Sequence, residues 1–123
     1  MTLQDRPTAA ELLEAVREFV ERDVMQREGL PPRVAFHARV AVNVLGILER
    51  ELTLGPELDA AERERLTTLL GHGGELDDLT AELSRKIRDG SLDDRRATVV
   101  EHVRESVRAK LLVANPGYLE RIR

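Results

Sequence analysis

The sequence predicts an all-α fold, a bundle of four longer helices plus one shorter peripheral helix. Three observations lead to this prediction. Apolar residues recur at helical spacing through most of the 123 residues. Gly and Pro separate these stretches, and no segment alternates apolar and polar residues as a strand does. Aromatic residues make up only 2% of the chain, whereas β-sheets favour aromatic and β-branched side chains. Because the length suits one domain, we expect residues 1–123 to form a single helical domain.

The first predicted helix begins after Thr8 and ends near Gly29. Thr8 and Glu11 form a capping-box pattern, in which each side chain can bond the other residue's backbone N–H. Glycine suits the left-handed conformation that often ends a helix. The spacing predicts an apolar face turned toward the core, made of Leu12, Val16, Phe19, Val20 and Val24.

The second and third predicted helices are separated at Leu54-Gly55-Pro56. Pro31 and Pro32 open the second helix, since proline is tolerated in a first turn. The first half of this helix is apolar on most sides, which is typical of a central helix. The third helix, residues 57–70, is more polar and has only a thin apolar edge. We therefore expect it to be the shorter, peripheral helix.

The last two predicted helices cover residues 75–89 and 94–114. Glycines at 71, 73 and 74 predict a flexible turn before them, and Gly90 ends the first of the two. The second stops at Asn115, because a residue that precedes proline disfavours the α conformation. Their inward faces are expected to be Leu76, Leu79, Leu83 and Ile87 in one helix, and Val99, Val103, Val107, Leu111 and Ala114 in the other.

Composition excludes several classes of function. There is no cysteine, so disulfides, zinc-thiolate sites and cysteine nucleophiles are ruled out. A net charge of −4 argues against nucleic-acid binding. No apolar run is long enough to span a membrane, and the N-terminus carries no signal pattern. These features predict a cytoplasmic protein.

The histidines do not match a metal site. A di-iron bundle uses Glu-x-x-His, but Val34 and Val99 stand three residues before His37 and His102. His102 is expected on a polar face with Glu105. We therefore predict no metal, no cofactor and no catalytic residue.

One polar stripe on the second helix is a candidate ligand site. Arg39, Asn43, Gly46 and Arg50 recur every three or four residues and so share a face. Arginine binds carboxylate or phosphate with two parallel hydrogen bonds, so Arg39 and Asn43 could hold an anionic group such as a phosphate or an acyl-CoA. The alternative is that these arginines pair with glutamates of neighbouring helices.

Two further residues stand at the margin of this candidate site. His37 shares a face with apolar residues, so we interpret it as a core or boundary histidine, with ligand contact as the functional alternative. Lys110 falls at the edge of the inward face of the last helix, where lysine usually reaches outward to solvent.

Several stretches of the sequence resemble one known family. They are FHARVAVN at 36–43, IRDG at 87–90, KLLVANPGYL at 110–119 and the opening RPTAAELL at 6–13. Together they are similar to a bacterial family of small proteins catalogued as domain of unknown function 6285. The likeness covers nearly the whole chain.

The resemblance implies a context rather than a mechanism. Such proteins tend to be encoded beside a kinase similar to aminoglycoside phosphotransferases, and often beside an acyl-CoA dehydrogenase. This implies a non-catalytic accessory protein of acyl-CoA metabolism that binds one of these enzymes. The alternatives are a binder of a small anionic ligand and, third, a small enzyme that uses His37 as acid or base. A homodimer is the other partner arrangement that the sequence leaves open.

Overall fold

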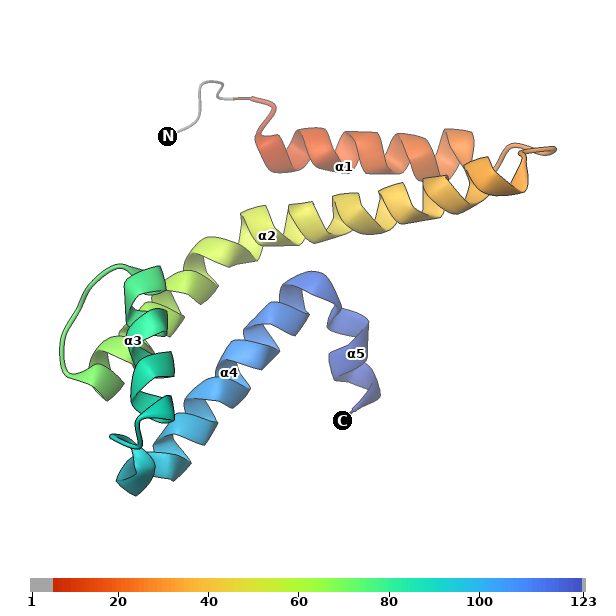
Figure 1. Cartoon of the computed structure of the whole chain (residues 1–123). Coiled ribbons are helices and arrows are strands. Elements are labelled where there is room, and N and C mark those ends of the chain that lie inside the picture. Colours follow the sequence, from red (N-terminus) through yellow and green to blue (C-terminus); the bar gives the residue numbers. More distant parts are fainter. Residues whose placement is uncertain (1–5, 123) are drawn as a thin grey trace. The chain divides into compact units, whose positions relative to one another are not determined.

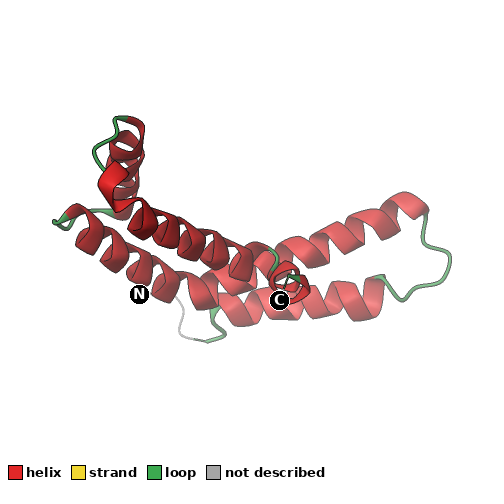
Figure 2. Cartoon of the chain, turned by 90° about the horizontal axis from the view of Figure 1, so that it is seen from below, coloured by secondary structure: helices red, strands yellow, loops and turns green. Residues whose placement is uncertain are grey.

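The computed structural model describes residues 6–122 and contains five α-helices, with no strand among these residues (Figure 2). The all-α class with four longer helices and one shorter helix is thereby confirmed. The first five residues, on which the expected lack of a signal pattern partly rests, lie outside the described residues, as does Arg123. The chain forms two compact units, which meet in sequence between Leu54 and Gly55. The prediction of a single domain stays a prediction.

Unit 1 begins with α1, Ala9–Phe19, which lies beside the N-terminal part of α2 (Figure 1). The predicted capping box is confirmed. The Thr8 N–H donates to Glu11 Oε1 at 3.0 Å, and the Glu11 N–H donates to Thr8 Oγ1 at 3.1 Å. A π-helical turn, Val20–Val24, follows α1. The helical segment therefore ends before Gly29, although Gly29 has the left-handed φ of +75° expected of it.

The predicted inward face of α1 is mostly turned to solvent. Leu12, Val16 and Phe19 are 44%, 51% and 56% exposed. Only the later part of the prediction holds, because Val20 and Val24 are half-buried. The spacing shows which side of the helix is apolar. It does not show whether another part of the protein covers that side.

Helix α2 is continuous over Pro32–Leu70, a length of 39 residues. The predicted break at Leu54–Pro56 is wrong. Pro56 has no N–H to donate to the carbonyl of Leu52, four residues earlier, but the helix continues through this local loss. One turn earlier, the Thr53 hydroxyl donates to the Glu49 carbonyl at 3.0 Å.

The sequence predicted a buried central helix here. The part of α2 in unit 1 is instead largely exposed. Among the described residues of unit 1, Ala38 alone is buried. An apolar stripe at intervals of four residues is instead between 39% and 54% exposed; it comprises Phe36, Val40, Val44, Leu48 and Leu52.

The core of unit 2 is built on the segment that was predicted to be peripheral. Leu66 is fully buried, and Leu69 is 4% exposed. They pack with leucines of α3, Leu76–Arg88, and of the connection that follows it. The thin apolar edge of residues 57–70 is therefore the centre of a core rather than an outer face. The complete core cluster is Leu66, Leu69, Leu79, Leu83 and Leu92.

The last two helices are α4, Arg96–Ala114, and the short α5, Pro116–Arg121. A 3₁₀ turn, Asp93–Arg95, leads into α4. Helix α4 ends where the sequence predicted, but α5 was missed. The Asn115 side chain starts α5 by accepting the Tyr118 N–H at 3.3 Å, so the residue that stops one helix caps the next. Val103 and Val107, predicted to face inward, are 44% and 50% exposed.

Candidate functional site

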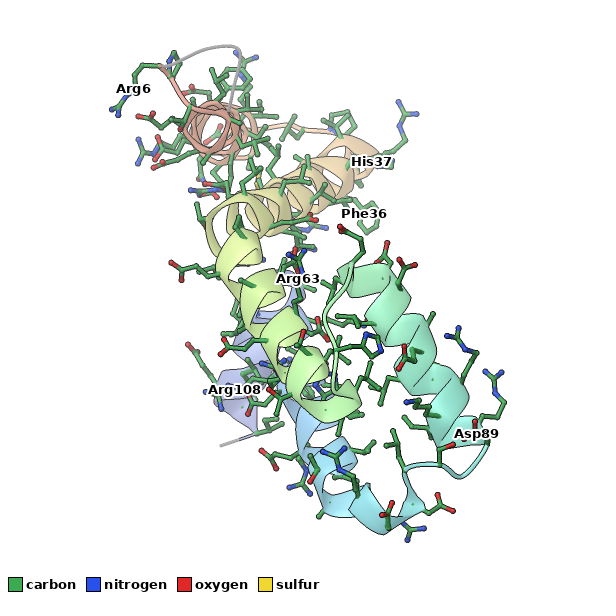
Figure 3. The ribbon with its side chains drawn as sticks, turned by 90° about the vertical axis from the view of Figure 1, so that its left-hand side faces the viewer. Arg6, Phe36, His37, Arg63, Asp89 and Arg108 are labelled. Atoms are coloured by element: carbon green, nitrogen blue, oxygen red, sulfur yellow. The ribbon has the colours of Figure 1, made fainter. Side chains whose placement is uncertain are left out.

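Arg39 and His37 project from the surface of α2. The Arg39 guanidinium lies 6.0 Å from the centre of the Phe36 ring, a cation–π contact. The His37 ring meets the same Phe36 ring edge-on at 5.5 Å (Figure 3). Both side chains are exposed, so His37 is not the core or boundary histidine that was predicted. The apolar residues that share its face are themselves open to solvent.

Asn43 lines a pocket of about 380 Å³ in unit 1. Arg17 of α1 crosses this pocket. Its Nε donates to Glu49 at 2.5 Å and its Nη1 donates to Glu21 at 2.8 Å. These hydrogen bonds raise the pKa of the Arg17 guanidinium. The lining residues are Arg17, Glu21, Val42, Asn43, Gly46, Glu49 and Arg50.

The charges of this pocket balance, with two arginines against two glutamates. The Arg50 guanidinium lies over Gly46, with Nη1 3.3 Å from the place that a Cβ would take. Glycine therefore makes room for an arginine of its own helix. Arg39 does not line the pocket, and Lys110 is exposed on α4 in unit 2. The anionic-ligand role of Arg39, Asn43, His37 and Lys110 stays a prediction.

A larger pocket, of about 470 Å³, lies in unit 2 between α2 and α4. Its wall contains His102, which is 6% exposed and is the one buried polar side chain among the described residues. His102 does lie among polar residues, as predicted, but this face of α4 is buried against α2. The lining residues are Ala61, Glu64, Arg65, Thr68, Leu69, Arg95, Thr98, Glu101 and His102.

His102 belongs to a small polar cluster with Ser106 and Glu62. The Ser106 hydroxyl donates to Glu62 Oε1 at 2.5 Å. His102 Nε2 lies 3.4 Å from Ser106 Oγ and 4.0 Å from Glu62 Oε1. Burial, reinforced by the charge of Arg65, lowers the pKa of His102 below its ordinary 6.5, and Glu62 opposes this in part.

This cluster contains serine, histidine and an acid, but it is not a hydrolytic triad. In a triad the serine and the acid bond opposite nitrogens of the imidazole. Here both partners lie on the Nε2 side, and the buried Nδ1 has no hydrogen-bond partner. The serine also gives its proton to the acid rather than to the histidine. The geometry therefore does not activate Ser106 as a nucleophile.

The two arginines of the unit 2 pocket differ in their bonding. Arg95 Nη1 donates to the Leu69 carbonyl at 2.7 Å, near the C-terminus of α2, where carbonyls lack helical partners. Arg65 Nε and Nη2 are buried and have no hydrogen-bond partner. Sequence reasoning missed Arg65 and His102, since Arg65 stands in a charge run typical of a solvated face.

The loop between α2 and α3 is held by His72. Its Nε2 lies 2.9 Å from Glu82 Oε1 of α3, and Glu82 also pairs with Lys86 at 3.3 Å. A hydrogen bond to the Gly73 carbonyl, followed by the bond to Glu82, raises the pKa of His72. The bond from His72 lowers the pKa of Glu82.

Residues 6–122 offer neither a metal-binding cluster nor a membrane-spanning helix. No group of three or more His, Asp or Glu side chains in this range is arranged to hold a metal ion. No helix in the same range combines the length and apolarity needed to cross a bilayer.

Comparison with known families assigns the chain to a protein family. The family model described as domain of unknown function DUF6285 matches residues 28–118, which is most of the sequence. The chain belongs to the DUF6285 family. The matched region of this DUF6285 domain contains all of α2, α3 and α4, and so includes both pockets' α2 residues. The curated proteins gave no match, and neither did the solved structures.

Proposed function

We propose that this DUF6285 domain is a non-catalytic interaction domain that works in the cytoplasm as an accessory to an enzyme. The partners that the family resemblance implies are a kinase similar to aminoglycoside phosphotransferases and an acyl-CoA dehydrogenase. The proposal is carried by one observation, the apolar side chains that unit 1 leaves exposed.

These side chains form ordered stripes rather than scattered positions. On α2, exposed residues recur every four positions from Phe36 to Leu52. On α1, Leu12, Val16 and Phe19 repeat at intervals of four and three. Contiguous exposed apolar surface of this kind marks interaction sites, whereas single exposed apolar residues are ordinary. An amphipathic helix face is also a common recognition element in protein complexes.

The absence of an activated nucleophile at the serine–histidine–glutamate cluster is consistent with a binding role. The proposal does not depend on it, because exposed stripes would serve an enzyme subunit equally well. What it requires is that the stripe on α2 is buried in a complex.

A pair of lysine substitutions on α2 tests this requirement. Val44→Lys places a charge in the middle of the stripe. Thr53→Lys places the same charge nine residues further on, which is two and a half helical turns and so the opposite face. Each variant is co-expressed with the kinase-like and dehydrogenase-like proteins encoded by the same genome, and co-purification is measured.

We expect the unsubstituted chain to co-purify with one of these enzymes, Val44→Lys to lose it, and Thr53→Lys to keep it. A buried charge without a partner costs several kcal/mol, about a thousandfold in affinity at 4 kcal/mol. Equal recovery with both variants would refute the α2 stripe as the interface. Recovery of a homodimer alone, sensitive to Val44→Lys, would replace the enzyme partner with a second copy of the chain.

A further inference from the structure

The pocket of unit 2 contains polar atoms that the fold buries without satisfying. Arg65 Nε and Nη2 lie on one edge of the guanidinium, and neither has a partner. His102 Nδ1, on a side chain that is 6% exposed, has none either. Buried donors and acceptors almost always find partners in native proteins, so each exception calls for an explanation. Here the exceptions belong to two residues that line the same pocket.

The hydrogen-bonding cluster decides what each atom requires. Ser106 gives its only hydroxyl proton to Glu62, so toward His102 its oxygen can only accept. The neutral imidazole therefore carries its proton on Nε2 and a lone pair on Nδ1. Nδ1 requires a donor. The Arg65 edge offers two parallel N–H groups, which match two oxygens of an oxyanion.

We propose that the pocket between α2 and α4 binds the phosphate group of a small phosphorylated molecule. Two phosphate oxygens accept from Arg65 Nε and Nη2, and a third oxygen, which keeps its proton, donates to His102 Nδ1. A phosphate monoester keeps one proton below its second pKa of about 6, so near pH 6 it offers acceptors and a donor together. A carboxylate or a sulfate at the same pH offers acceptors alone.

The rest of the pocket fits a molecule larger than phosphate. Its volume of about 470 Å³ lies in the range of small-ligand sites. Ala61, Leu69, Thr68 and Thr98 are among its lining residues. Glu64 and Glu101 also line it, but both are exposed. Water therefore screens their charges more than it screens the buried Arg65 edge.

Binding includes a movement of Arg65 and of His102. Arg65 Nε and Nη2 and His102 Nδ1 are all closed to solvent in this conformation, so the guanidinium edge and the imidazole must turn toward the cavity to meet a phosphate. The experiment therefore follows these nitrogens directly. Amide and side-chain NMR signals of the full chain are recorded while inorganic phosphate is added, and separately while sulfate is added at equal ionic strength.

We expect saturable shifts of the Arg65 Nε–H and His102 ring signals with phosphate, and about tenfold weaker binding of sulfate, the effect of one lost hydrogen bond. Arg65→Gln should abolish the response. Arg63→Gln, an equal loss of charge at an exposed position of the same helix (Figure 3), should preserve it.

Three results would overturn the proposal: no saturable shift at millimolar phosphate, sulfate binding as well as phosphate, or equal loss in both variants. A stronger response to acetate than to phosphate would assign the pocket to a carboxylate instead. If Arg65→Gln does not fold, the comparison of phosphate with sulfate on the unsubstituted chain decides alone. Shifts with phenyl phosphate that exceed those with inorganic phosphate identify an organic phosphate as the ligand class.

Discussion

His72 connects a glycine-rich loop to α3 through a single ion pair. Its Nε2 lies 2.9 Å from Glu82 Oε1, and both side chains titrate in an accessible pH range. The pKa of His72 is raised above its ordinary 6.5, and the pKa of Glu82 is lowered below its ordinary 4.5. Each shift favours the charged form that the pair requires.

The sign of each shift fixes the pH window in which the pair stabilises the fold. The stabilisation from His72 is complete below pH 6.5 and is lost as pH rises through its pKa in the folded chain. The stabilisation from Glu82 is complete above pH 4.5 and is lost as pH falls through its lowered pKa. The pair therefore contributes most between these two values.

An NMR titration of the His72 ring protons checks the pairing. We expect a pKa above 6.5 in the unsubstituted chain. Glu82→Gln should lower it only in part, because the hydrogen bond to the Gly73 carbonyl, the larger cause of the shift, remains while the acceptor carboxylate is removed. Glu75→Gln, an equal change of charge at an exposed residue beside the loop, should leave it raised. A His72 pKa that both variants lower equally would mean that general charge, rather than the contact, causes the shift.

The core of unit 2 is concentrated in a few leucines, and Leu66 of α2 is the most buried of them. Leu66→Ala removes apolar contact and leaves a cavity, since the surrounding leucines of α3 relax only in part. We expect the free energy of unfolding to fall by about 2–5 kcal/mol.

Leu52→Ala is the matched control, because Leu52 lies on the same helix and is 48% exposed. Its expected loss is below about 1 kcal/mol. Denaturant unfolding of both variants measures the difference. Equal losses would contradict the assignment of the core to the second half of α2.

Local signals allowed some helix ends to be predicted, although Gly55 and Pro56 wrongly predicted a break in α2. The failures to predict burial have a common cause. The Thr8 capping box and the stop at Asn115 depend on neighbouring residues, so the sequence shows them directly. Leu66 and His102 are buried by contact between helices that are distant in sequence. Nothing within residues 57–70 distinguishes a thin apolar edge on the surface from one that meets three leucines of other segments.

The same limit applies to the candidate sites. The stripe of Arg39, Asn43 and Gly46 follows from helical spacing, but the pocket around Asn43 depends on Arg17 of α1 and its glutamates. The pocket around His102 is lined by residues of α2 and of α4 that are distant in sequence. Spacing predicts which residues share a face, and tertiary contacts decide which of those faces become sites.

At the scale of the whole molecule, the two compact units differ in how much apolar surface they bury. Unit 2 buries five leucines as one cluster. Among the described residues of unit 1, only Ala38 is buried, while large apolar side chains of α1 and α2 remain exposed. Unit 1 therefore gains less hydrophobic stabilisation for the backbone that it orders.

Hydrogen exchange of the full chain tests this imbalance. Regions with few buried apolar contacts open at lower free energy, and their amide protons exchange sooner. We expect the amides of α1 to exchange faster than those at the centre of α3, where Leu79 and Leu83 are buried. Both helices are short, at 11 and 13 residues, so end fraying affects them alike.

Equal protection of α1 and α3 at low protein concentration would contradict the imbalance. Protection of α1 that rises with protein concentration, or on addition of an enzyme partner, would show that the exposed apolar side chains of unit 1 are covered in the assembled state. Val44→Lys puts a charge into the exposed apolar stripe of α2 and leaves the leucine cluster of unit 2 intact. It should therefore cancel the added protection of α1 and leave the exchange of α3 unchanged.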